Sequence, residues 1–123
     1  MSERRSRSGH RAAAAPLVAT VFLASLGFVG AARGDDDASQ LALGKALFTN
    51  NATPPCALCH TLKDAGTAGA VGPVLDELRP DAARVATALR NGIGAMPSYK
   101  ALLKDDQIQA LARYVSKASG GAP

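Results

Sequence analysis

Both cysteines of the chain and one of its two histidines lie within residues 54–60, which read PPCALCH. Cysteine and histidine at this spacing serve three kinds of chemistry: a redox dithiol, part of a metal site, or a covalent anchor for haem. A redox dithiol normally lies at the start of a helix that follows a strand. No strand pattern precedes Cys56, and a dithiol gives His60 no role.

A metal site and a plain disulfide both leave part of this motif unexplained. A structural zinc site needs four ligands, and Cys56, Cys59 and His60 supply three at most. The other histidine, His10, lies in the N-terminal segment, so a carboxylate would have to complete the site. A disulfide between Cys56 and Cys59 leaves His60 without a role.

Covalent haem attachment accounts for all three residues. Thiols three positions apart lie on one helical turn and can add to the two vinyl groups of a single porphyrin, and His60 follows Cys56 by four positions, on the same face. Cys-x-x-Cys-His is the attachment signature of c-type haem. The segment after residue 34 has no tryptophan and three aromatic residues, Phe48, Tyr99 and Tyr114. Because so small a domain rarely builds a sufficient core unaided, the sequence favours one covalent haem c.

Met96 is the candidate for the second axial ligand of the iron. It is the only methionine after residue 34 and lies in the Gly/Pro-rich stretch GIGAMPSY. A lone methionine often fills a core, but Met96 is far from any amphipathic stripe, and no other soft ligand remains. His/Met ligation is common in haem electron carriers. A six-coordinate iron of this kind favours electron transfer, whereas an iron from which small molecules displace Met96 would indicate a ligand-binding or catalytic haem.

Three helices are expected to position these residues. The apolar spacing predicts helices at 39–48, 81–90 and 105–118, with Ser39 as the N-cap of the first. The third has the clearest stripe, formed by Ile108, Leu111, Ala112 and Val115. No strand-like alternation is visible, so an all-α class is expected. The long stretch at 49–80 is expected to wrap a bound group.

The N-terminal segment indicates export. Residues 1–34 hold five arginines against one glutamate, whereas residues 35–123 hold nine basic against nine acidic residues. The remainder of the chain has no net charge, so it lacks the excess of basic residues that is typical of nucleic-acid-binding proteins. Residues 1–34 have a charged start, a short apolar core and small residues before Asp35, which is the pattern of a signal peptide. We therefore expect a signal peptide at 1–34 and a domain at 35–123 that is located in the periplasm. The alternative is an uncleaved anchor at 12–32, the one case in which a membrane would be involved.

With these motifs in place, residues 39–118 resemble the small class I cytochromes c. The resemblance rests on CALCH, on VGPVL at 71–75, on AMP at 95–97 and on the flanking helices. It implies crossed terminal helices in which Gly44 meets Tyr114, with loops that wrap the haem. It also implies that the Pro73 carbonyl accepts a hydrogen bond from His60. Val74 departs from the asparagine of many relatives, and the lack of tryptophan prevents a transfer of haem-propionate contacts.

The resemblance also implies a function. The chain is expected to be an electron carrier, not an enzyme, with a permanently bound subunit of an oxidoreductase as a further alternative. The stretch CHTLKDAGTAGAVGPVLDEL is similar to cytochromes that accept electrons from periplasmic molybdenum sulfite dehydrogenases. A terminal oxidase or another cytochrome would then be the acceptor. A small apolar docking patch is expected at the haem edge, formed by Ala57, Leu58, Ile93 and Ala95.

Overall fold

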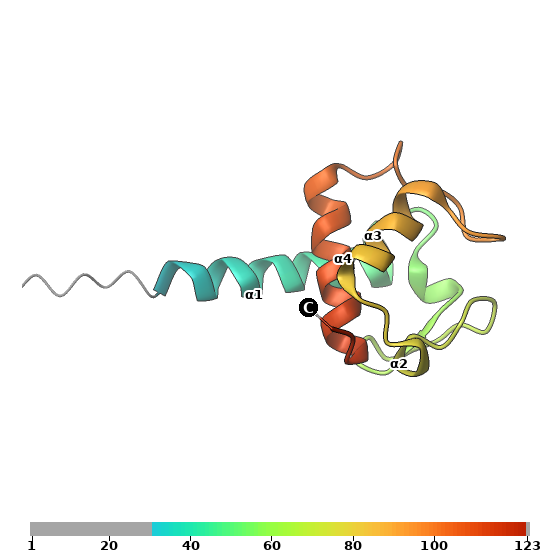
Figure 1. Ribbon diagram of the computed structural model, residues 1–123, viewed down its shortest axis with the longest axis horizontal. Helices are drawn as coiled ribbons and strands as arrows, with labels where there is room; N and C mark the ends of the chain where they lie inside the picture. Colours follow the sequence, from blue (N-terminus) through green and yellow to red (C-terminus); the bar gives the residue numbers. More distant parts are fainter. Residues whose placement is uncertain (1–30, 123) are drawn as a thin grey trace, which may run out of the picture.

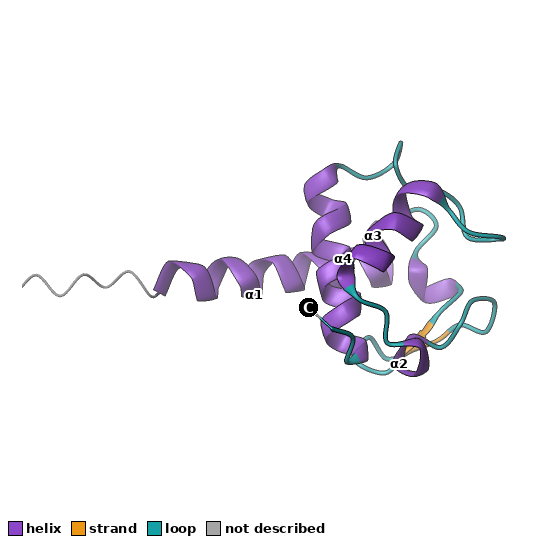
Figure 2. Ribbon diagram, viewed as in Figure 1, coloured by secondary structure: helices purple, strands orange, loops and turns teal. Residues whose placement is uncertain are grey.

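Helices make up most of the computed structural model, which describes residues 31–122 (Figures 1 and 2). The elements in order are α1 (Ala31–Ala46), the π-helical turn η1 (Leu47–Asn51), the 3₁₀ turn η2 (Cys56–Leu58), β1 (Thr61–Leu62), β2 (Thr67–Ala68), α2 (Leu75–Leu78), α3 (Ala82–Asn91) and α4 (Asp105–Ser119). The expected all-α class is confirmed. None of the helices in this described part has both the length and the hydropathy to cross a bilayer. The predicted signal segment lies outside the described residues, apart from its last four positions.

The first helix begins earlier than expected. It includes Ala31, so the predicted start at Ser39 and the role of Ser39 as N-cap are wrong. The Ser39 hydroxyl instead donates a hydrogen bond to the Asp36 carbonyl within the helix, at 2.9 Å. A serine that bonds back to the preceding turn is compatible with a helix interior. The helical path also continues past Phe48 through η1, where the Ala52 amide donates to the Leu47 carbonyl.

The second and third helices lie where the sequence predicts them. Asp81 caps α3, because its carboxylate accepts a hydrogen bond from the Arg84 amide at 2.7 Å. At the start of α4, the Gln107 side chain accepts from the Lys104 amide at 2.9 Å. Gly120, at a φ of 76°, ends α4 in the left-handed region that glycine tolerates. The four residues of the α4 stripe are all buried.

The long segment between η1 and α3 contains local structure that the sequence does not predict. β1 and β2 form a short antiparallel hairpin in which Thr61 pairs with Ala68 and Leu62 with Thr67. The hydroxyl of Thr67 donates to the His60 carbonyl at 2.9 Å and accepts from the Leu62 amide at 3.1 Å. The single turn α2 follows. These elements are too short to produce a periodic pattern, so periodicity could not reveal them.

The core forms where α1 and η1 pack against α4. Figure 1 shows α1 crossing α4, with the N-terminal turns of α1 projecting from the rest of the molecule. Gly44 is buried at the crossing, and the rings of Phe48 and Tyr114 meet edge to face, with their centroids 6.1 Å apart. The Tyr114 hydroxyl donates to Asp64 at 2.7 Å, and Lys45 lies 3.1 Å from the same carboxylate oxygen. The hairpin is thus tied to both crossing helices.

Candidate haem site

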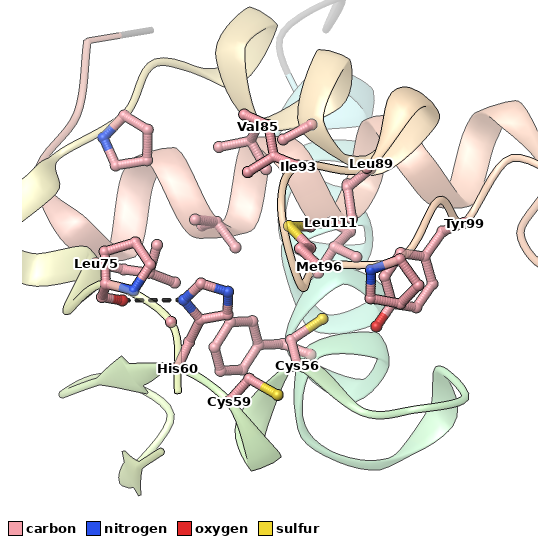
Figure 3. A pocket seen from close by; sticks show the side chains of 18 of the residues that line it. Cys56, Cys59, His60, Leu75, Val85, Leu89, Ile93, Met96, Tyr99 and Leu111 are labelled. Atoms are coloured by element: carbon pink, nitrogen blue, oxygen red, sulfur yellow. Dashed lines mark hydrogen bonds between the residues drawn. The ribbon is translucent and has the colours of Figure 1, made fainter. Parts of the chain in front are cut away.

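A largely apolar cavity of about 600 Å³ opens beside this core. This volume is in the range of roughly 300–1,000 Å³ that ligand sites usually have. The cavity brings together the five residues expected to bind or orient the cofactor: Cys56, Cys59, His60, Pro73 and Met96. Figure 3 shows that Cys56, Cys59 and His60 come from one segment and Met96 from another. Its apolar walls include Leu75, Val85, Leu89 and Leu111.

The two cysteines lie on one tight turn. The amides of Cys59 and His60 both donate to the Cys56 carbonyl, at 3.1 and 2.9 Å. Both thiols are free, and Cys56 is buried. Burial raises the pKa of the Cys56 thiol to about 11. Redox dithiols need a lowered thiol pKa, so this environment disfavours the redox interpretation.

The backbone after the hairpin fixes the ring of His60. Nδ1 of His60 donates a hydrogen bond to the Pro73 carbonyl at 2.9 Å, drawn as the dashed line in Figure 3. In the neutral ring, this bond places the hydrogen on Nδ1 and leaves Nε2 available as a ligand atom. Gly72 lies against the ring, because a Cβ there would stand 2.8 Å from Nδ1. Its amide donates to the Cys59 carbonyl at 2.7 Å.

Met96 lies in a closed turn between α3 and α4. The backbones of Ile93 and Met96 exchange two hydrogen bonds, of 3.0 and 2.9 Å. Gly92 has a φ of 69°, and a Cβ there would lie 2.8 Å from the Met96 carbonyl oxygen. This turn therefore requires glycine at position 92. Met96 is half-buried and lines the cavity.

Tyr99 is a cavity residue to which sequence reasoning gave no role. Its side chain is only 3% exposed, and its hydroxyl donates to the Pro54 carbonyl at 2.7 Å. Its amide also donates to the Leu89 carbonyl at 2.7 Å. The scarcity of aromatic residues could have drawn attention to Tyr99. Its hydrogen-bond partner could not be predicted, because Pro54 lies 45 positions away.

The expected docking patch is largely exposed. Leu58 and Ile93 are 65% and 69% exposed, Ala95 is exposed and Ala57 is half-buried. Ile93 and Ala95 also line the cavity. Exposed apolar side chains beside the cavity are compatible with the expected docking patch.

The chemistry of these donors fits haem and not zinc. Within residues 31–122, no group of three or more His, Cys, Asp or Glu side chains is arranged to hold a metal ion. The cavity instead offers two adjacent thiols, an imidazole with a free Nε2 and a thioether inside apolar walls. This set suits a large apolar macrocycle that contains iron.

Comparisons with known proteins agree with this fit. Residues 39–115 match a family model described as cytochrome c oxidase, cbb3-type, subunit III. The chain is 32% identical to cytochrome c6 of Bryopsis maxima over 88 residues, which are 63% of this chain and 91% of that protein. It is also similar to the crystal structure of the c-type cytochrome SorU from Sinorhizobium meliloti, with 54% identity and a TM-score of 0.65 over 68% of this chain and 95% of the other.

The expectations of a class I cytochrome c fold and of a covalent haem c are thereby confirmed, as is the expectation of an electron carrier with redox partner proteins. The matched region begins at Ser39 and includes the attachment turn, the Met96 loop and most of α4. The chain belongs to this family of cytochrome c domains and is a small monohaem class I cytochrome c, an electron carrier rather than an enzyme.

Proposed function

We propose that this cytochrome is an exported, periplasmic electron carrier whose haem is held by Cys56 and Cys59 and ligated by His60 and Met96. The observation that carries the proposal is the position of these four side chains around one apolar cavity. His60 and Met96 are also the only histidine and methionine after residue 34. No other histidine or methionine after residue 34 is therefore available as an axial ligand.

Each residue has a distinct task in this proposal. The two thiols would form thioether bonds to the haem, from Cys56 in η2 and from Cys59 directly after it. The Pro73 carbonyl orients the ring of His60. As a ligand, the thioether of Met96 would favour the reduced iron and raise the potential. When bound, haem c supplies a one-electron couple between Fe(III) and Fe(II).

The closed site favours electron transfer over substrate activation. If His60 and Met96 both bind the iron, no coordination position would be open to a substrate. A hydrogen bond to the Pro73 carbonyl orients His60, and two backbone hydrogen bonds between Ile93 and Met96 give the Met96 turn a defined shape. Fixed ligands in an apolar cavity limit the rearrangement that accompanies a change of charge. The exposed patch of Ala57, Leu58, Ile93 and Ala95 then serves as the electron port.

Substitution of Met96 tests the ligation. Met96→His is expected to keep a six-coordinate spectrum but lower the midpoint potential, because imidazole favours Fe(III) more than a thioether does. Met96→Ala is expected to lose the near-infrared band of methionine-ligated Fe(III) and to bind cyanide readily. Ile93→Ala, an exposed change in the same turn, is the control and should keep the wild-type spectrum. An unchanged spectrum and potential in Met96→Ala would favour the ligand-binding alternative.

We further propose that the electron donor is a periplasmic molybdenum sulfite dehydrogenase. The sequence likeness around residues 59–78 supports this donor, with a terminal oxidase or another cytochrome as acceptor. The test follows haem reduction after mixing with the purified dehydrogenase and sulfite. Leu58→Ser and Ile93→Ser should slow reduction, whereas Leu102→Ser changes a residue that is 58% exposed outside the patch and should not. Equal slowing by all three would reject the patch, and no reduction of the wild type would reject this donor.

The periplasmic location rests on the N-terminal sequence. A cleaved signal predicts that the mature protein begins near Asp35 and appears in the periplasmic fraction. Cell fractionation and N-terminal sequencing of the haem-containing protein provide the measurement. An intact N-terminus in the membrane fraction would support the anchor at 12–32 instead.

A further inference from the structure

We propose that Tyr99 is a positioning residue that holds the Met96 loop closed against the attachment loop, and thereby limits the exchange of Met96 for external ligands. This inference rests on the proposed ligation by Met96. It extends that proposal to a residue that neither binds the iron nor forms a thioether.

The geometry places one hydrogen bond between the two loops that hold the cofactor. Pro54 lies two positions before Cys56, and Tyr99 lies three positions after Met96. Among the hydrogen bonds of residues 31–122, the bond from the Tyr99 hydroxyl to the Pro54 carbonyl is the one that joins segments 52–60 and 92–103. Figure 3 shows the Tyr99 ring beside Met96 at the end of the cavity nearer to Cys56.

Tyr99 is itself held firmly, so its hydroxyl can act as a fixed point. Its amide donates to Leu89 in α3, and its carbonyl accepts from the amides of Leu102 and Leu103, both at 2.9 Å. The ring is almost fully buried. The backbone of Tyr99 is thus fixed to α3 and to the turn before α4, and the hydroxyl extends this support to the attachment loop.

The Met96 turn has much weaker support at its tip. Its two backbone hydrogen bonds join Ile93 and Met96 to each other and not to the rest of the domain. Ile93 is 69% exposed, and a Cβ added to Gly94, which has a φ of 54°, would meet nothing within 4 Å. A turn that is closed within itself can move as a unit, so its position depends on the contacts at its base. Tyr99 supplies the base contact that reaches the other loop.

The test of this role is to remove the hydroxyl group of Tyr99. Tyr99→Phe keeps the ring and deletes the bond, and it leaves the Pro54 carbonyl without this partner. The loss of such a bond is expected to raise the population of the open loop about fivefold to tenfold. External ligands bind only when the thioether leaves the iron, so their apparent affinity should rise by the same factor.

The experiment measures imidazole binding to the ferric mature holoprotein, and Tyr114→Phe is the matched control. Tyr114→Phe makes the same chemical change but deletes the hydroxyl bond to Asp64, which ties the hairpin to α4. Tyr99→Phe is expected to bind imidazole about fivefold to tenfold more tightly. Tyr114→Phe should bind it as the wild type does, even where its thermal stability falls. Equal binding by both variants, or an effect of Tyr99→Phe on stability alone, would overturn the proposal.

A second measurement avoids dependence on the folding of Tyr99→Phe. The chain has two tyrosines, so Tyr99 is the only one in the Tyr114→Phe protein, and fluorotyrosine can be introduced at this single position. A more acidic hydroxyl donates a stronger hydrogen bond, which should weaken imidazole binding. Unchanged or tighter binding would contradict the role of the bond.

The Met96→Ala variant separates the failure of this inference from the failure of the proposed ligation. If Met96→Ala keeps the wild-type spectrum, Met96 is not the ligand and the proposed function fails. If Met96→Ala opens the iron while Tyr99→Phe binds imidazole as the wild type does, the ligation stands and only the role of Tyr99 is rejected.

Discussion

Gly44 of α1 lies so close to Tyr114 of α4 that a Cβ at position 44 would stand 2.5 Å from the Cβ of Tyr114. It would also meet the Ala110 backbone. Glycine lowers the stability of a helix by about 1 kcal/mol relative to alanine. The close approach of the two backbones explains why glycine is nevertheless needed at this position. The crossing that the family resemblance implied is therefore present.

Gly44→Val is expected to lower the free energy of unfolding by about 1–3 kcal/mol, because the added methyl groups must push α1 and α4 apart. Urea unfolding of the holoprotein provides the measurement. Ala42→Val is the control, since Ala42 is exposed on the same helix and reports the effect of a β-branched residue alone. Similar losses for the two variants would mean that the crossing is not tight.

Gly72→Ala is expected to disturb His60. The new methyl group would lie against the imidazole ring and displace it from the Pro73 carbonyl. Because that bond orients the ring, the midpoint potential and the proximal imidazole resonances in NMR spectra should shift. Ala70→Ser changes an exposed residue of the same segment and should leave both unchanged. Wild-type values for Gly72→Ala would show that the ring tolerates the contact.

The two thiols should be required for covalent haem. Cys56→Ala or Cys59→Ala is expected to reduce the yield of mature holoprotein sharply, because each removes one thioether bond. The wild type should retain its haem through acid–acetone extraction, with the absorbance of the pyridine haemochrome per protein as the measurement. Leu58→Ala alters an exposed residue within the same motif and should not reduce attachment. Haem-free wild-type protein after extraction would contradict covalent binding.

Asp64 should make stability depend on pH in the acid range. The hydrogen bond from Tyr114 and then the one from Lys45 lower the pKa of the Asp64 carboxyl. An acid with a lowered pKa in the folded state stabilises the fold above its ordinary pKa of about 3.9, and this contribution is lost as pH falls through the folded value. Because the carboxylate is half-exposed, we expect the contribution at neutral pH to be about 1 kcal/mol or less.

Asp64→Asn tests this contribution. The free energies of unfolding of the wild type and the variant should differ at neutral pH and converge as the pH falls below about 4. Glu77→Gln, an exposed carboxylate change, is the control for a general effect of charge. A constant difference between wild type and Asp64→Asn at all pH values would show that titration of Asp64 is not coupled to folding.

The predictable parts of the fold are those that carry a periodic or local signal. The α3 and α4 helices combine apolar spacing with caps, so their positions follow from the sequence to within about one residue. The start of α1 does not, because Ser39 can bond within a helix as well as cap one. The hairpin at 61–68 escapes notice because each strand has only two residues.

Some residues of the site can likewise be recognised from the sequence, whereas some of its contacts cannot. Cys56, Cys59 and His60 are recognised by spacing, and Met96 by elimination, because the chemistry leaves few other choices. The bond from His60 to Pro73 followed from the family resemblance. The bond from Tyr99 to Pro54 joins residues far apart in the sequence, and no local pattern encodes such a pair.

The contact between positions 44 and 114 also constrains the order in which the protein matures. It closes the whole segment between them into a single loop, and that loop contains every residue proposed to hold the haem. Cys56 is only 9% exposed once the loop has closed, so its side chain is then poorly accessible from solvent. We therefore expect the proposed thioether bond of Cys56 to form before the terminal helices meet.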